Sequence, residues 1–287
     1  MFKNMSIKKL TIRSILLLCV VKMSAVGAAQ LESATNPLPI FDAHIHYSDD
    51  AREAFAPADA IRRLREAGIK RALVSSTSDE STQLLYQADP DFVVPSLRPY
   101  RKRGTLDTWM HDESVIPYIR ERLQKYRYAA IGELHIDGEE ANAPVMREII
   151  RLAREYRLML HVHSDAQAIK LIFEQDPDAR ILWAHAGFEF AETVRDLMFK
   201  HDNLWADLSF RYDAFPNGTF LPEWQDLLVD HADRFLLGID TFTPQRWLQI
   251  NEIMQWQRQL LATLPADVAR KIAYQNGEHI TGLFDGE

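Results

Sequence analysis

Short runs of apolar, β-branched residues alternate along the chain with longer segments whose apolar residues recur every three or four positions. Runs of the first kind predict β-strands, and segments of the second kind predict amphipathic helices. The predicted strands are residues 40–47, 71–76, 92–98, 129–136, 158–164, 181–187, 204–210 and 235–241. The predicted helices are residues 57–67, 81–87, 115–125, 144–156, 167–174, 189–200, 222–231, 245–264 and 267–283.

This alternation predicts the fold class. Strands that are apolar throughout are buried on both faces, which indicates a parallel sheet covered by helices. Eight strand–helix units in about 250 residues favour an α/β fold of the (β/α)8 TIM-barrel type, formed as a single domain by residues 30–287. The alternative is an open, doubly wound sheet. Its first strand is normally followed by a glycine-rich loop, whereas residues 42–46, Asp-Ala-His-Ile-His, stand in that place here.

Residues 1–29 differ from the rest of the chain and are predicted to be a secretory signal peptide. They combine a basic start without acidic residues, an apolar run over residues 15–21, and small residues up to Ala29. The apolar run is interrupted by Lys22 and is far shorter than the roughly 20 residues of a membrane-spanning helix. An uncleaved anchor is therefore the less favoured alternative. We expect cleavage near Ala28 or Ala29 and a periplasmic or secreted protein without a stable membrane anchor.

Charge and cysteine content narrow the function classes. Removing the leader takes five of the 33 basic residues and no acidic ones, which leaves 28 basic against 41 acidic residues and a net charge near −13. Such a chain repels phosphate backbones, so a nucleic-acid partner is not expected. The single cysteine, Cys19, lies in the leader. The mature protein therefore has neither a cysteine nucleophile nor a cysteine-ligated zinc site.

Histidines are concentrated in the predicted strands rather than in loops. His44 and His46 end the first strand, and because they are two residues apart their side chains point to the same face. Catalytic residues of a (β/α)8 barrel project from the carboxyl ends of its strands. At that position two imidazoles can share one divalent ion, each at roughly 2.0–2.1 Å. The pair alone is a weak signal, since two polar strand residues can also be adjacent by chance.

The fourth and fifth predicted strands end with the same kind of pattern. Glu133 and His135 lie on one face of the fourth strand, where a buried carboxylate needs either a metal ion or a salt bridge to a barrel arginine. His161 and His163 share a face of the fifth strand. Because His163 is nearer the carboxyl end, we expect it to reach the mouth and His161 to be a hydrogen-bonded histidine one layer lower.

Four further strands carry polar residues at or near their ends. His185 ends the predicted sixth strand, and Asp240 ends the eighth, where an aspartate can ligate a metal and accept a proton from metal-bound water. On the seventh strand, Asp207 is expected to cap a helix or to lie at the surface. Arg98 ends the third strand and is a candidate for binding a substrate carboxylate or carbonyl, with a structural ion pair as the equal alternative.

The chain resembles the amidohydrolase superfamily, and in particular its amidohydrolase-related (amidohydrolase 2) branch. The resemblance rests on the strand-by-strand order of residues 42–46, His163, His185 and residues 238–240 (Gly-Ile-Asp). The resemblance covers the chain from about Pro39 to Phe284. It implies metal ligation by residues at the ends of strands one, four, five, six and eight. The implied ligands are His44, His46, Glu133, His163, His185 and Asp240.

The resemblance implies a divalent metal, by default zinc, with manganese or another divalent ion as alternatives, and one or two ions per chain. In a two-ion site, Glu133 and His185 would hold the second ion. The implied activity is hydrolysis of a lactone, amide or ester by a metal-activated water, with Asp240 and His185 as catalytic residues. Arg98, His135 and His161 are the candidate contacts to a small-molecule substrate.

Two alternatives to the hydrolase stay open at this stage. One is a metal-dependent decarboxylase of the same branch, which Glu133 disfavours because a bridging carboxylate fits a hydrolytic site better. The other is an exported binding protein that kept the barrel but lost its activity. In the loops beyond the strands, Trp109, Tyr212 and Phe215 could stack on a ring of the substrate or pack internally. The sequence predicts no oligomeric state.

Overall fold

The computed structural model describes residues 37–282, apart from the side chain of Asn217. The chain divides into two units, Met1–Leu38 and Pro39–Glu287, and the fold below is that of the second. The predicted signal peptide and its cleavage site lie outside the described residues. Within residues 37–282, no helix is both long and apolar enough to cross a bilayer.

Eight parallel strands form one sheet in the order of the sequence, from β1 to β8. They are β1 (Ile40–Ile45), β2 (Ile69–Ser75), β3 (Val93–Leu97), β4 (Ala130–His135), β5 (Met159–His163), β6 (Ile181–Trp183), β7 (Leu204–Asp207) and β8 (Phe235–Leu236). The sheet closes on itself, because Asp42 forms a parallel bridge with Leu237 and the amide of Ala43 donates to the carbonyl of Leu237 at 2.8 Å. This arrangement confirms the predicted (β/α)8 barrel.

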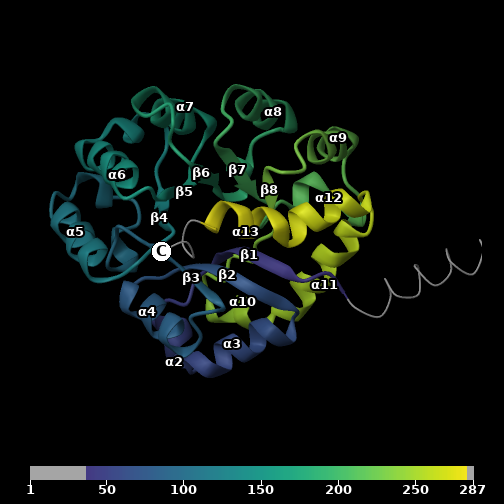
Figure 1. Cartoon of the computed structure of the whole chain (residues 1–287), viewed down its shortest axis with the longest axis horizontal. Helices are drawn as coiled ribbons and strands as arrows, with labels where there is room; N and C mark the ends of the chain where they lie inside the picture. The colour runs from purple at the N-terminus through teal and green to yellow at the C-terminus, as the bar shows by residue number, and fades with distance from the viewer. Residues whose placement is uncertain (1–36, 283–287) are drawn as a thin grey trace, which may run out of the picture. The chain divides into compact units, whose positions relative to one another are not determined.

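Helices surround the strands (Figure 1). They are α2 (Asp49–Ala54), α3 (Pro57–Glu66), α4 (Asp79–Ala88), α5 (Val115–Lys125), α6 (Pro144–Glu155), α7 (Ala166–Gln175), α8 (Ala191–Lys200), α9 (Pro222–Asp230), α10 (Pro244–Leu248), α11 (Ile250–Leu261), α12 (Ala266–Arg270) and α13 (Asn276–Thr281). The expected helix 81–87 is longer, since α4 begins at Asp79. The expected helix 245–264 is divided at Gln249 into α10 and α11.

The last three strands are shorter than predicted, which corrects the placement of two site residues. Strand β6 ends at Trp183 and β8 at Leu236, so His185 and Asp240 lie in the loops that follow their strands. Both residues have a left-handed backbone, with φ of 56° and 57°. This conformation cannot continue a strand. Apolar residues beyond these points extended the predicted strands although the backbone had already turned out of the sheet.

The C-terminal segment covers the barrel at the amino ends of the strands. Ile280 of α13 packs with Phe41 of β1 and Leu236 of β8 in the core, and Asn276 donates from Nδ2 to the carbonyl of Phe235 at 2.8 Å. At Gly277 a Cβ would lie 2.2 Å from the ring of Phe41, so only glycine allows this approach. The end of the barrel opposite α13 is therefore where the strand-end histidines converge.

Candidate metal centre

His44 lies near the carboxyl end of β1 and His46 directly follows the strand, and both side chains are buried at the carboxyl end of the barrel. His44 donates from Nδ1 to Oδ2 of Asp207 at 3.0 Å, and His46 donates from Nδ1 to the carbonyl of Ser75 at 2.6 Å. A carboxylate and a carbonyl can only accept, so each neutral ring carries its proton on Nδ1 and a lone pair on Nε2. Both Nε2 atoms are thus prepared to bind a cation.

The two Nε2 atoms lie 3.1 Å apart. Two lone pairs at this separation repel each other unless a cation lies between them or one ring is protonated. Two nitrogens at about 2.0–2.1 Å from one ion lie roughly 2.9–3.4 Å apart for ligand angles between about 90° and 110°. The observed spacing therefore fits two ligands of a single metal ion.

His185 presents a third imidazole in the same way. Its Nδ1 lies 3.0 Å from the carbonyl of Ser209, which makes Nδ1 the donor, and its Nε2 points back toward the centre. That Nε2 lies 3.8 Å from Oε1 of Glu133 and 3.8 Å from Oδ2 of Asp240. Arg211 holds the loop in place by donating to the carbonyl of His185 at 3.1 Å.

Two carboxylates complete the cluster of Nε2 atoms. Glu133 places Oε1 3.3 Å from Nε2 of His44 and Oε2 3.2 Å from Nε2 of His46. Asp240 places Oδ1 3.2 Å from Nε2 of His46. This Oδ1 is buried and accepts no hydrogen bond from residues 37–282, and a neutral His46 cannot donate to it. An anionic oxygen in that position needs a cation as its partner.

A backbone irregularity positions Glu133. The register between β4 and β5 shifts between Gly132 and Leu134, and Gly132 has a φ of 142°. A Cβ at this glycine would lie 2.1 Å from the carbonyl oxygen of His161. Only glycine therefore allows β4 to approach β5 at the point where the Glu133 carboxylate enters the centre of the barrel.

The electrostatic balance of the cluster is negative. Burial raises the pKa of Glu133, Asp207 and Asp240, but the neighbouring histidines outweigh it and hold all three pKa values below their usual range. The described guanidinium in direct contact with these carboxylates is that of Arg98, whose Nη2 lies 2.5 Å from Oε2 of Glu133. With the imidazoles neutral, as metal binding requires, three carboxylates against one guanidinium leave two negative charges, which a single divalent ion neutralises.

His44 responds to the same field. Burial disfavours its charged form, but the carboxylates of Asp240, Glu133 and Asp207 reverse this and hold the pKa of His44 well above its usual value. A proton on His44 and a metal ion at its Nε2 therefore compete for the same lone pair. The site is built for a positive charge in either case.

The remaining predicted site residues are divided between two positions. His163 and His135 form a stacked pair, with ring centroids 4.2 Å apart, on the solvent side of Glu133. Nδ1 of His163 is 2.9 Å from Oε1 of Glu133, and Nε2 of His135 is 3.1 Å from Oε2. The sequence predicted His163 beside His44, His46 and Asp240. In the structure its donor atom lies closest to those of Glu133 and His135.

His161 and Arg98 both have partners within the cluster. His161 is buried beneath His44, with ring centroids 4.6 Å apart and Nε2 3.6 Å from Oδ2 of Asp207. Arg98 is 7% exposed and is engaged by Glu133. The structural ion pair, one of the two alternatives for Arg98, is thus present.

Asp207 is neither a helix cap nor a surface residue, so the placement expected from the sequence was wrong. It is completely buried, and its Oδ1 accepts from the amides of Ser209 at 2.9 Å and His185 at 3.3 Å while Oδ2 faces His44. The signal was available, because an aspartate that ends an apolar strand needs buried partners. Ligand orientation by such outer carboxylates is common in metal sites.

Four groups of donor atoms in the described residues lie close enough to hold an ion. They are His44–His46–Asp240, His44–Glu133–His185, His44–His161–Asp207 and Glu133–His135–His163. The first two share His44 and together present three oriented imidazoles and two carboxylates. Imidazole and carboxylate donors suit zinc and other divalent transition ions. The residues present therefore fit a divalent metal.

Comparison with known proteins supports the fold. No family model and no curated protein sequence matches this chain. An uncharacterized TIM-barrel protein from Bordetella bronchiseptica matches with a TM-score of 0.62 and 15% identity over 86% of this chain and 100% of its own. A candidate 2-pyrone-4,6-dicarboxylic acid hydrolase from Pseudomonas putida matches with a TM-score of 0.57 and 14% identity, over 87% and 99%.

An amidohydrolase from Burkholderia multivorans, solved with bound zinc, also matches, with a TM-score of 0.53 and 10% identity over 85% of this chain and 99% of its own. At these identities the likeness establishes the (β/α)8 barrel. Several of the proteins that share it are hydrolases by name, which agrees with the resemblance stated from the sequence.

Proposed function

We propose that this chain is an exported, metal-dependent hydrolase of the amidohydrolase-related branch, which opens a lactone, ester or amide. The observation that carries the proposal is the convergence of three Nε2 atoms, from His44, His46 and His185, whose Nδ1 atoms all face acceptors. Tautomers fixed in this way supply lone pairs to a metal rather than protons to a substrate.

The ion would be held by His44, His46 and Asp240, with Glu133 and His185 completing its surroundings. A bound divalent ion of this kind lowers the pKa of its water from 15.7 to about 7 and so supplies a nucleophile at neutral pH. The charge balance of the cluster favours one ion per chain, because Arg98 already compensates one of the three carboxylates.

Asp240 is the proposed proton acceptor. Burial raises its pKa, but the neighbouring positive charge, that of His44 first, outweighs burial and lowers the pKa, so the carboxylate is ionised at neutral pH. Its Oδ1 accepts no hydrogen bond from the described residues. The backbone on either side is fixed, since the amide of Asp240 donates to the carbonyl of His44 at 2.7 Å and Arg246 donates to the carbonyl of Asp240 at 3.0 Å.

His185 is better suited to ligation than to acid catalysis. Burial lowers its pKa, and its Nδ1 proton is directed at the carbonyl of Ser209. A neutral ring in this tautomer has no proton on Nε2 to give to a scissile carbonyl. Of the two roles considered for His185, we therefore propose the metal ligand.

The test is to purify the mature protein, measure its metal content by mass spectrometry, and assay lactones, esters and amides before and after chelation. We expect activity to be lost with the metal and restored by zinc or manganese. Asp240→Asn should lower kcat by about 10²- to 10⁴-fold, the range for removing a positioned base. Release of CO2 without incorporation of labelled oxygen from water would instead support the decarboxylase.

We further propose export after cleavage near Ala28 or Ala29, on the basis of the leader sequence alone. Expression of the full chain with its native leader, followed by fractionation and mass determination of the N-terminus, tests this. An intact leader on protein that stays in the cytoplasm would contradict export without affecting the proposed hydrolysis.

A further inference from the structure

Aromatic side chains form one continuous wall beside the candidate metal centre. The ring of Phe188 stacks on His185 with centroids 4.7 Å apart, and the ring of Phe210 lies 5.9 Å from His185. Phe242 lies 5.8 Å and Tyr212 6.1 Å from Phe210. These four residues, Phe188, Phe210, Tyr212 and Phe242, are called the aromatic wall below.

Three of the four side chains of the aromatic wall are about half exposed to solvent. Phe188 is 53%, Phe242 46% and Tyr212 44% exposed. Clustered exposed apolar groups in a folded protein mark a place where a ligand binds. Phe188 and Phe210 also adopt left-handed backbone conformations, with φ of 54° and 59°, and such strain is concentrated at ligand sites.

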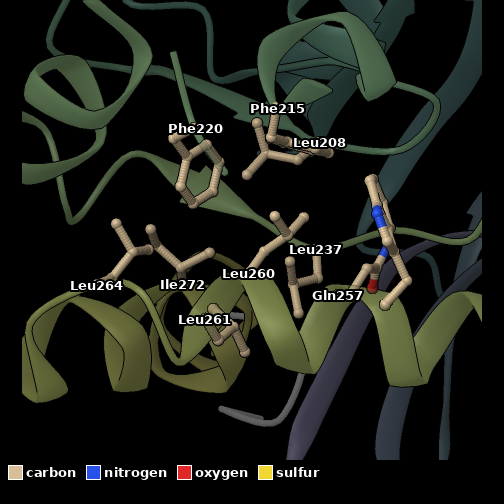
Figure 2. A pocket seen from close by; sticks show the side chains of 10 residues that line it. Leu208, Phe215, Phe220, Leu237, Gln257, Leu260, Leu261, Leu264 and Ile272 are labelled. Atoms are coloured by element: carbon tan, nitrogen blue, oxygen red, sulfur yellow. The ribbon is translucent and has the colours of Figure 1, made fainter. Parts of the chain in front are cut away.

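Two other aromatic residues in the loops after the strands are buried instead. Trp109 and Phe215, which could also have stacked on a substrate, are 1% and 2% exposed. Phe215 lines a small apolar pocket between the loop after β7 and helix α11 (Figure 2). Exposure of aromatic residues at this end of the barrel is therefore selective, and Phe188, Phe242 and Tyr212 combine exposure with ring contacts that lead to His185.

Four arginines near the metal centre or the aromatic wall already have partners. Arg98 pairs with Glu133, Arg103 with Asp50 at 2.9 Å, Arg211 with Asp213 at 2.8 Å, and Arg246 with the carbonyls of Asp240 and Ile239. Recognition of substrate carboxylates normally uses an arginine fork that is available for two hydrogen bonds. The guanidinium groups of Arg98, Arg211 and Arg246 are not available in that way, and that of Arg103 already contacts Asp50 and the carbonyl of Phe242.

We infer that the substrate is a neutral ester, lactone or amide that carries an aromatic or bulky apolar group, which lies against the aromatic wall while the scissile carbonyl faces Asp240. This inference rests on the proposed hydrolysis and specifies its substrate class. It separates this chain from an enzyme for dicarboxylated substrates, because neither the aromatic wall nor the engaged arginines provide for additional negative charge.

The experiment compares three lactones on the metal-loaded protein: dihydrocoumarin, the same compound with a ring carboxylate, and δ-valerolactone, which has no aromatic ring. We expect dihydrocoumarin to have the highest kcat/KM and its carboxylated form to be poorer by at least 10-fold. Phe188→Ala and Phe242→Ala should each lower the ratio of kcat/KM for dihydrocoumarin over δ-valerolactone by roughly 2- to 12-fold, the range for a lost aromatic contact. Phe188→Tyr, which keeps an aromatic ring at this position, should retain the wild-type ratio.

Phe199→Ala is the matched control, because Phe199 is 83% exposed on α8 and belongs to neither the metal centre nor the aromatic wall. It should leave the ratio unchanged. Equal ratios in Phe188→Ala and the wild type, or a preference for the carboxylated lactone, would overturn the inference even if hydrolysis is metal-dependent.

Binding of dihydrocoumarin, measured by saturation-transfer NMR, keeps the two claims apart. Binding that weakens in Phe188→Ala supports the inference even if no lactone is hydrolysed, an outcome that would count against the proposed function alone. No detectable binding together with no turnover would remove both.

Discussion

Asp207→Asn is the most informative perturbation of the candidate metal centre, although it changes only one atom. Oδ1 of Asp207 accepts from the amides of Ser209 and His185, while Oδ2 accepts the Nδ1 proton of His44. Asparagine has one oxygen for these two sides. If that oxygen stays with the two amides, its NH2 group faces His44 and forces the ring to carry its proton on Nε2, where the metal should bind.

The expected magnitude follows from this geometry. Loss of an outer-shell partner typically costs 10- to 100-fold in metal affinity, equivalent to about 1.4–2.7 kcal/mol. The wrong tautomer adds to this cost, as it does in catalytic triads. Asp207→Asn should therefore bind metal at least as weakly as Asp207→Ala, which leaves Nδ1 of His44 without its acceptor but imposes no tautomer.

The assay is competition for zinc between each metal-free variant and a chromogenic chelator at fixed pH, with thermal unfolding as a check of folding. Asp196→Asn, at an exposed position of α8, is the control and should match the wild type. An affinity of Asp207→Asn within threefold of the wild type, or clearly above that of Asp207→Ala, would refute the tautomer argument.

Three further predictions address the surroundings of the site. Arg98→Met raises the excess negative charge of the cluster from two to three, so metal content should rise from one ion toward two per chain by mass spectrometry; two ions in the wild type would contradict the charge balance. Burial lowers the pKa of His161 to about 4 from a usual 6.5, so the unfolded state gains a proton first as pH falls. The free energy of unfolding of the metal-free wild type should then fall by about 3 kcal/mol more between pH 7 and pH 4 than that of His161→Leu. Urea unfolding at each pH measures this, and an equal fall in both proteins would contradict it. Gly277→Ala places a Cβ 2.2 Å from the Phe41 ring and should destabilise the fold by about 1–3 kcal/mol without changing metal affinity, as thermal unfolding and chelator competition can check.

Much of the site could be predicted because strand periodicity and barrel topology are both visible in a sequence. The spacing of His44 and His46 fixed a common face, and the structure brings their Nε2 atoms within 3.1 Å of each other. Barrel topology then placed Glu133 and Asp240, from distant parts of the chain, beside the same pair. These inferences need only the direction of a side chain and the end of a strand.

Alternation along a strand gives the face of a residue but not its depth, and this explains where the structure differs from the expected placements. The bulge at Gly132 moves Glu133 into the centre, between His44 and His163. The donor atom of His163 therefore lies next to Glu133 and His135, and its role as a metal ligand stays a prediction. The left-handed turns at His185 and Asp240 depend on local backbone energetics that an apolar run conceals. Asp207 was missed because a carboxylate without a visible partner is normally assigned to the surface.

The position of the proton on each imidazole decides which nitrogen can bind a metal, and this position cannot be read from the sequence. His44, His46 and His185 are oriented by three different acceptors: the carboxylate of Asp207 and the carbonyls of Ser75 and Ser209. Two of these acceptors are backbone atoms, which any side chain would supply equally well. Substitution of Ser75 or Ser209 removes a hydroxyl that lies 3.2 Å or 2.8 Å from the Nδ1 atom but keeps the carbonyl acceptor, whereas a change at Asp207 removes the acceptor of His44 itself. Of the three acceptors, only the one at His44 is a side-chain atom. A substitution at Asp207 can therefore change the orientation and tautomer of His44 while the metal ligand itself stays a histidine.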